Sequence, residues 1–399
     1  MTDPQVSPEQ MAALRSWSGA PGAVDRFVAE LAELVAIPSG VGDAVGVARV
    51  AEALAAPFRD LGAAVELRSD GPAGPTLVAQ LTGARPGRRL ALIGHLDTVG
   101  APDDPAPRLD VRDGRAWGMG SVDMKGGLLL AVHALQAIRV VAGGLPFGEV
   151  LVIDGPDEEI GSPVGSVAMR ELVPGCDAAL VLEPGRPSGA LVVARKGMLQ
   201  ARVRVTGRAA HAGVEPDKGR SALLAAAHAT IALHALSGTV GGAAGGVTVN
   251  VGTMHGGTRP NVVPAEATLE LDLRATTVTA MDSAIAAIRA VCAAPAVPDV
   301  TMDLTIATSF PPMERLPSTD AMLARVAGVA SMLGLSPGAV ATGGASDANT
   351  IAGLGVPVLD GLGPIGGGMH GPDEHIELAA LPDRVALLAG AILELTAPG

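Results

Sequence analysis

The sequence predicts an α/β protein with a mostly parallel, buried sheet, into which a smaller α+β domain is inserted. In the first half of the chain, short apolar runs alternate with helical segments, which is typical of parallel strands covered by helices. After Gly197 the pattern changes to strands with one polar face. Charge changes as well: residues 198–308 hold eight Lys and Arg against eight Asp and Glu, although the 399-residue chain has a net charge of −13.

Hydrophobic periodicity places the elements that precede the insertion. The predicted helices are Ala23–Val35, Ala44–Leu61, Lys125–Val141 and Val164–Leu172, and the predicted strands are Leu90–Gly94, Val150–Ile153 and Ala178–Leu182. The most apolar run, Leu128–Ala142, is too short to span a bilayer and predicts a buried helix.

The inserted domain is predicted to have the order β-α-β-β-α-β, which is the split ferredoxin-like unit. Its predicted strands are Leu199–Thr206, Val247–Val251, Ala265–Arg274 and Val300–Ala307, its helices Arg220–Leu236 and Val278–Ala293, and its loop Gly241–Gly246. Pro311-Pro312 marks the exit, and the α/β pattern resumes at Ser318 and ends with a helix over Pro382–Leu395. We therefore predict one domain from residues 1–197 and 310–399, and a second from 198–309.

Composition argues against several classes of protein. The negative charge disfavours nucleic acid as a partner, because phosphate binding needs a basic face. With four Phe, two Trp and no Tyr, the core is expected to consist of Ala, Val and Leu. Cys176 and Cys292 lie far apart in apolar contexts and are expected to be reduced, buried thiols. The N-terminus lacks the apolar core of a signal peptide, so we expect a soluble, cytoplasmic protein without a membrane partner.

Acidic and histidine side chains follow the predicted strands at the points where those strands end. The residues concerned are His95, Asp97, Glu158, Glu159 and Glu183 after strands, and Asp123 just before a helix. Sites in open α/β sheets form beyond the carboxyl ends of the strands, so these side chains are expected to share one crevice.

Carboxylates that crowd into one crevice repel each other and need cations to stay ionised. A mixture of histidine and carboxylate ligands suits zinc, and less selectively cobalt or manganese. A carboxylate can also bridge two ions about 3.5–4 Å apart. The pattern therefore predicts a metal site.

The chain resembles the co-catalytic two-zinc family of aminoacylases, glutamate carboxypeptidases, acetylornithine deacetylases and succinyl-diaminopimelate desuccinylases. The resemblance covers nearly the whole chain. It is carried by Gly94-His95-Leu96-Asp97-Thr98-Val99, Gly120-Ser121-Val122-Asp123-Met124-Lys125-Gly126-Gly127, Pro156-Asp157-Glu158-Glu159-Ile160-Gly161-Ser162, Leu182-Glu183-Pro184, Gly207-Arg208-Ala209-Ala210-His211-Ala212-Gly213, Asn261-Val262-Val263-Pro264 and Met369-His370-Gly371-Pro372-Asp373-Glu374.

The resemblance implies a zinc-peptidase-like catalytic domain that binds two Zn²⁺ ions, with Co²⁺ or Mn²⁺ as possible substitutes. His95 and Glu183 would bind one zinc, Glu159 and His370 the other, and Asp123 would bridge them. Glu158 would be the general base on the metal-bridging water, and Asp97 would orient His95. The resemblance also implies a cis peptide at Asp123-Met124.

The same resemblance implies that the inserted domain is a lid and dimerisation module. His211 would reach the active site of the partner subunit in a homodimer and donate to the oxyanion. Arg274 would hold a substrate carboxylate, and Asn261, Gly344 and Ser346 are further candidates for substrate contacts.

These residues predict a hydrolase of the carboxypeptidase or aminoacylase type that acts on a small N-acyl amino acid or dipeptide with a free carboxylate. Two alternatives stay open: a deacylase of the acetylornithine or desuccinylase kind, and a family member that binds a ligand without cutting it. The glutamate carboxypeptidases carry a further Arg at the exit of the lid, where this chain has Phe310-Pro311-Pro312. That difference predicts a more apolar pocket.

Overall fold

The computed structural model describes residues 6–100, 108–240 and 246–398, so most of the loop predicted at Gly241–Gly246 lies outside the described residues. The described chain divides into two compact units. Unit 1 comprises Met1–Val193, Arg315–Ala341 and Ser346–Gly399, and unit 2 comprises Ala194–Glu314 and Thr342–Ala345.

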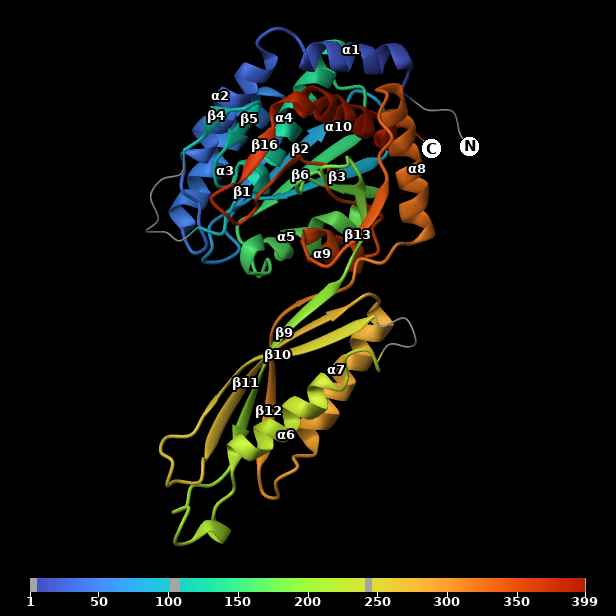
Figure 1. The fold of residues 1–399 in the computed structure, drawn as a ribbon. Helices are drawn as coiled ribbons and strands as arrows, with labels where there is room; N and C mark the ends of the chain where they lie inside the picture. The colour runs from blue at the N-terminus through green and yellow to red at the C-terminus, as the bar shows by residue number, and fades with distance from the viewer. Residues whose placement is uncertain (1–5, 101–107, 241–245, 399) are drawn as a thin grey trace. The chain divides into compact units, whose positions relative to one another are not determined.

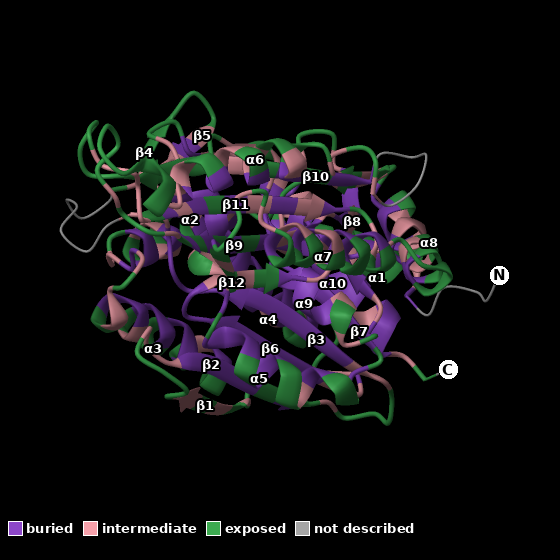
Figure 2. Cartoon of the chain, turned by 90° about the horizontal axis from the view of Figure 1, so that it is seen from below, coloured by how far each residue is buried: buried purple, intermediate pink, exposed green. Residues whose placement is uncertain are grey.

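Unit 1 is built on a six-stranded sheet in the order β1-β2-β6-β3-β7-β14. Its strands are β1 (Ala64–Arg68), β2 (Thr76–Thr82), β3 (Arg89–His95), β6 (Glu149–Gly155), β7 (Ala178–Val181) and β14 (Val358–Leu359). The pairs β6–β3, β3–β7 and β7–β14 are parallel, whereas β1 and β2 run antiparallel at one edge. The predicted α/β class with a mostly parallel sheet is confirmed, and Figure 2 shows β2, β3 and β6 largely buried.

Helices cover both faces of this sheet. They are α1 (Pro8–Ser18), α2 (Ala23–Val35), α3 (Ala44–Asp60), α4 (Gly126–Val141), α5 (Gly165–Leu172), α8 (Pro317–Met332), α9 (Asp347–Gly353) and α10 (Leu381–Thr396). Figure 1 shows α4 and α10 on one side of the sheet and α5 and α9 on the other. A small sheet of unit 1 contains β4 (Asp110–Arg112), β5 (Arg115–Trp117), β15 (Gly366–Gly367) and β16 (His375–Glu377). A further two-stranded sheet pairs β8 (Leu191–Arg195) with β13 (Ala339–Thr342), whose last residues belong to unit 2.

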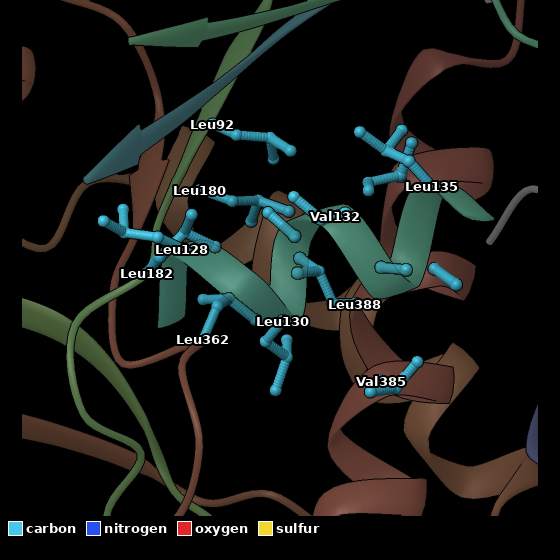
Figure 3. Packing of buried hydrophobic residues seen from close by; sticks show 14 of the residues in the cluster. Leu92, Leu128, Leu130, Val132, Leu135, Leu180, Leu182, Leu362, Val385 and Leu388 are labelled. Atoms are coloured by element: carbon cyan, nitrogen blue, oxygen red, sulfur yellow. The ribbon is translucent and has the colours of Figure 1, made fainter. Parts of the chain in front are cut away.

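The core of unit 1 is aliphatic, as the composition predicts. Figure 3 shows leucine and valine side chains of α4, the central strands and α10 packed together, including Leu92, Leu130 and Leu388. By length and composition, one helix of the described chain, Ser121–Val141, is long and apolar enough to cross a membrane. This helix is longer than Leu128–Ala142, the apolar run that we judged too short to span a bilayer. However, 78% of its most apolar window is buried, as in the core helix of a soluble protein.

Unit 2 contains a four-stranded antiparallel sheet in the order β10-β11-β9-β12, with two helices packed on it. Its elements are β9 (Gly197–Thr206), α6 (Ala222–His234), β10 (Val247–Gly256), β11 (Glu266–Ala275), α7 (Val278–Ala293) and β12 (Thr301–Phe310). The chain order β-α-β-β-α-β and the strand order are those of a split ferredoxin-like unit. Both cysteines of the chain, Cys176 in unit 1 and Cys292 in unit 2, are free and buried.

Candidate metal centre

The ends of three parallel strands bring the acidic and histidine side chains together. His95 is the last residue of β3 and lies opposite Gly155, the last residue of β6. Glu183 follows two residues after β7, which pairs with the other side of β3. The expectation that these side chains share one edge of the sheet is therefore met within unit 1.

Asp123 lies between two histidines. Its Oδ1 is 3.2 Å from His95 Nε2 and its Oδ2 is 3.1 Å from His370 Nε2. The Asp123-Met124 peptide is cis, as the resemblance implies. Two glycines after Lys125 let this segment approach the sheet, because a Cβ at Gly127 would clash with the carbonyl oxygen of Leu182.

Each histidine also has a glutamate nearby. Glu183 Oε1 is 3.9 Å from His95 Nε2, and Glu159 Oε2 is 3.4 Å from His370 Nε2. Two atoms that bind one tetrahedral zinc at ~2.1 Å lie about 3.4 Å apart, so these spacings are close to those of a zinc ligand set. In two sets of three, His95 with Glu158 and Glu183, and His95 with Asp123 and Glu159, all the ligand atoms lie within 4.8 Å of one another.

The electrostatics of this cluster also fit a cation site. Burial raises the pKa of Glu159 to about 7. Burial, together with the charge of Glu183, raises the pKa of Glu158 well above its ordinary value. Glu159 Oε1 is buried and has no hydrogen-bond partner within the described residues. Crowded carboxylates with an unsatisfied oxygen are the environment that bound cations stabilise.

The two histidines lower the pKa of Asp123, whereas burial raises the pKa values of the glutamates. Burial disfavours the charge of Asp123, but hydrogen bonds from His370 and His95 hold the pKa of this carboxyl below its usual range. Burial lowers the pKa of the His95 imidazole, but hydrogen bonds to Asp123 and Asp97 and the nearby negative charges outweigh it and raise this pKa well above the ordinary value. Asp123 is therefore held in its ionised form by the two histidines.

Asp97 links the histidine to the loop that carries both glutamates. Its Oδ1 is 3.2 Å from His95 Nδ1 and accepts the backbone N–H of Glu158 at 3.0 Å. Its Oδ2 accepts the backbone N–H of Glu159 at 3.0 Å. Asp97 is 1% exposed, so water does not compete for these contacts. One carboxylate thus positions three residues of the cluster.

We expect Asp97→Asn to lower kcat/KM by about 10- to 100-fold, the range typical of residues that orient metal ligands. The amide NH₂ group would face either the N–H of Glu158 or that of Glu159, and two donors cannot bond to each other. Steady-state kinetics and the metal content of the variant check this. Unchanged activity with full metal content would contradict the positioning role.

Two further acidic residues support the cluster and received no role from the sequence. Glu374 Oε1 accepts the backbone N–H groups of Val122 at 2.9 Å and Asp123 at 3.0 Å, and this side chain is buried. Asp347 is buried and accepts a hydrogen bond from the Ser162 hydroxyl, just after the glutamate loop. Glu374 stands in one of the matched motifs, yet only the folded chain shows that it holds the Asp123 segment.

In unit 2, His211 lies on an exposed turn beside Asn261. The Ala212 N–H donates to the Asn261 carbonyl at 3.0 Å, and His211 forms a bridge with Val262. The Nδ1 atom of His211 accepts the backbone N–H groups of Gly213 and Val214 at 3.2 and 3.1 Å. A neutral ring in this arrangement carries its proton on Nε2, so His211 presents a hydrogen-bond donor.

The predicted substrate contacts have partners of their own. Arg274 forms a two-pronged pair with Asp272 on the same strand, with distances of 2.9 and 3.0 Å. The Gly344 carbonyl accepts from Arg195 at 3.0 Å. Ser346 is buried, its hydroxyl donates to Asp360 at 2.9 Å, and it caps α9. Contact of these residues with a substrate stays a prediction.

Phe310, at the end of β12, is buried and only 4% exposed. The more apolar substrate pocket that we predicted from this position stays a prediction.

The profile of Peptidase family M20/M25/M40 matches residues 91–394. Carboxypeptidase G2 of Pseudomonas sp. (strain RS-16) is 28% identical over 373 residues, which cover 92% of this chain and 88% of that protein. The succinyl-diaminopimelate desuccinylase of Granulibacter bethesdensis is 29% identical over 330 residues, 77% of this chain and 83% of that protein. Among solved structures, the aminopeptidase PepT of Bacillus cereus superposes with a TM-score of 0.79 at 25% identity, covering 93% of this chain and 98% of that chain.

Proposed function

This chain belongs to Peptidase family M20/M25/M40 and is a metallohydrolase that acts on amide bonds, and from that premise we propose that it cleaves small N-acyl amino acids or dipeptides with a free carboxylate. The observation that carries the proposal is the position of Asp123, with one carboxylate oxygen facing each of two histidines. Such an arrangement suits a carboxylate shared by two metal ions.

Two zinc ions fit the residues present. His95 and Glu183 would hold one ion, Glu159 and His370 the other, and Asp123 both. When bound, the ions supply Lewis-acid polarisation of the scissile carbonyl and make water more acidic.

Glu158 is the proposed general base. Its carboxylate lies within 4.8 Å of a ligand atom of His95 and one of Glu183, and its backbone N–H is held by Asp97. Glu158 takes a proton from the attacking water and later passes it to the leaving amine. Glu158 thus transfers the proton without being one of the proposed metal ligands, although it is next to one of them, Glu159.

The proposed substrate carries a free carboxylate that Arg274 binds. Guanidinium and carboxylate groups match in a two-pronged geometry, which Arg274 already shows with Asp272. Asn261 and the backbone of Gly344 are proposed to add hydrogen bonds. Acetyl or succinyl release is the second candidate, which the similarity to a desuccinylase favours.

A substrate panel tests this proposal. We expect the zinc-loaded protein to release the C-terminal amino acid from dipeptides or N-acyl amino acids, and removal of the metal by a chelator to abolish turnover. Faster release of acetyl or succinyl groups from diamino acids would favour the second candidate. Failure on every member of the panel with zinc bound would contradict both.

We also propose that unit 2 is a lid and dimerisation module whose His211 serves the partner subunit. Helix α6 supports this, because it has no Asp, Glu, Lys or Arg yet leaves Leu224 51% and Ile231 71% exposed. An apolar helix face of this kind is normally covered, and a second copy of the chain would cover it. The Nε2–H donor of His211 would then stabilise an oxyanion.

We expect Ile231→Asp to convert a dimer into a monomer and to lower turnover with it. A charge at this position opposes burial against a second α6. Analytical ultracentrifugation and kinetics measure the two effects. Val45→Asp, at a 72% exposed valine of α3 in unit 1, is the matched control and should stay dimeric and active. An active, monomeric wild-type protein would refute this assignment of His211.

A further inference from the structure

A cavity of about 120 Å³ lies in unit 1 beside the first turn of α10, and no residue of the proposed metal centre lines it. Asp383 and Arg384 of α10 line it together with Ser188, which follows β7, and Leu335, which follows α8. Figure 1 shows α8 and α10 in this part of unit 1.

Arg384 is a buried cation without an anionic partner. Its side chain is 3% exposed, and no carboxylate within the described residues pairs with it. Nε donates to the Gly363 carbonyl at 2.8 Å and Nη2 to the Gly361 carbonyl at 2.6 Å, which leaves the Nη1 donors for a ligand. Burying an uncompensated charge is costly, so an anion at this place would be strongly favoured.

The start of α10 adds to the attraction for an anion. Ala380, the N-cap residue, also lines the cavity, and this helix end has no side-chain cap. The Leu381 N–H donates to the Leu378 carbonyl and Pro382 has no N–H, so the N–H groups of Asp383 and Arg384 remain at the positive end of the helix. A carboxylate beside Arg384 would interact with both features.

Asp383 places the opposite charge on the same wall. Its Oδ1 accepts from Arg15 Nε at 2.6 Å and its Oδ2 from Arg15 Nη2 at 3.4 Å, but each carboxylate oxygen can accept a second hydrogen bond and the side chain is 24% exposed. The rest of the lining includes the apolar side chains of Leu335, Ile365 and Leu387. A ligand that satisfies all of these features has a carboxylate, an ammonium group and a small apolar substituent.

We propose that this cavity binds a free α-amino acid with a small apolar side chain, its carboxylate on Arg384 and its ammonium group on Asp383. A volume of this size suits a small amino acid. Binding of this ligand does not depend on the proposed hydrolysis.

The cavity is connected to Glu183 through one loop. The Gly363 carbonyl accepts from Arg384, and the Gly363 N–H donates to the Glu183 carbonyl at 2.9 Å. A carboxylate bound to Nη1 of Arg384 would shift the guanidinium, and with it the Gly363 loop that contacts Glu183. We therefore expect non-competitive inhibition by the amino acid, and this consequence rests on the proposed metal centre.

Isothermal titration calorimetry of the metal-loaded chain tests the binding. Alanine is expected to bind saturably and at least ~10-fold more tightly than propionate, which lacks the ammonium group, or ethylamine, which lacks the carboxylate, because each loses one charged contact. Asp383→Asn should weaken alanine binding by about tenfold or more, and Arg384→Lys should weaken it through loss of the guanidinium fork.

Arg15→Gln is the matched control, because it removes the same ion pair as Asp383→Asn but keeps the carboxylate. Its alanine affinity should equal or exceed that of the wild type. Equal affinity in the wild type, Asp383→Asn and Arg15→Gln would place the bound alanine elsewhere and overturn the proposal. Absence of saturable binding up to about 10 mM alanine would overturn it as well. Neither result depends on whether the chain hydrolyses any substrate.

Discussion

Replacing Glu158 by Gln is expected to lower kcat by about 10³-fold or more while both metal ions remain bound. The amide keeps the shape of the side chain but cannot accept the proton of water at neutral pH. Asp97 holds the backbone N–H of Glu158, not its side chain, so the loop should keep its conformation. Kinetics on the best substrate of the panel, with metal analysis of the same sample, measure both quantities.

Glu171→Gln is the control for this experiment, because Glu171 is an exposed residue of α5 that pairs with Arg68. It should leave kcat unchanged. A Glu158→Gln variant within about tenfold of the wild type would show that another group takes the proton. A wild-type chain with bound zinc and no turnover on any substrate would instead favour a family member that binds without cutting.

Replacing Asp123 by Asn is expected to reduce the metal content from two ions to one or fewer and to abolish measurable turnover. The substitution removes the negative charge that both ions share, and it points an NH₂ group toward His95 or His370. Zinc titration and elemental analysis measure the stoichiometry. Retention of two ions would contradict the bridging role.

Asp154→Asn is the matched control, since Asp154 is a buried carboxylate on β6 whose oxygens have no hydrogen-bond partner within the described residues. This variant should keep both ions.

Burial raises the pKa of Asp154 to about 7, so the folded chain favours the protonated acid. The folded chain therefore has its full stability with respect to Asp154 below the unfolded pKa of about 3.9. It loses this stability as the pH rises through about 7, because the buried carboxyl must then ionise. Thermal melts should show a larger stabilisation by Asp154→Asn at pH ~8 than at pH ~5.

Hydrophobic periodicity predicted the regular elements best where apolar residues recur at helical spacing along the whole element. The helices Ala23–Val35 and Val278–Ala293 begin and end at the predicted residues. Strands β1 and β2 were missed, because β1 is a short edge strand with mixed polarity and β2 pairs antiparallel beside it. Nothing in the local sequence indicates such a pairing, which depends on the central strands already being in place.

The candidate site was predicted from motif identity and strand ends, and the geometry adds what spacing cannot provide. The supporting role of Glu374 depends on a contact across 251 positions of the chain, from Glu374 to Asp123. The buried hydroxyl of Ser346 and the pairing of Arg274 with Asp272 are likewise products of packing. The sequence shows which side chains are present, but it does not show whether packing has already given them a hydrogen-bond partner.

The contacts of Asp97 limit which substitutions can change the metal preference of this centre. A single carboxylate serves the His95 imidazole and the amides of Glu158 and Glu159, so no substitution there can adjust one of the three alone. Glu183 and His370 lie outside that set of contacts. Variants selected for a different metal ion would accordingly accumulate changes around Glu183 and His370, while position 97 stays invariant under the same selection.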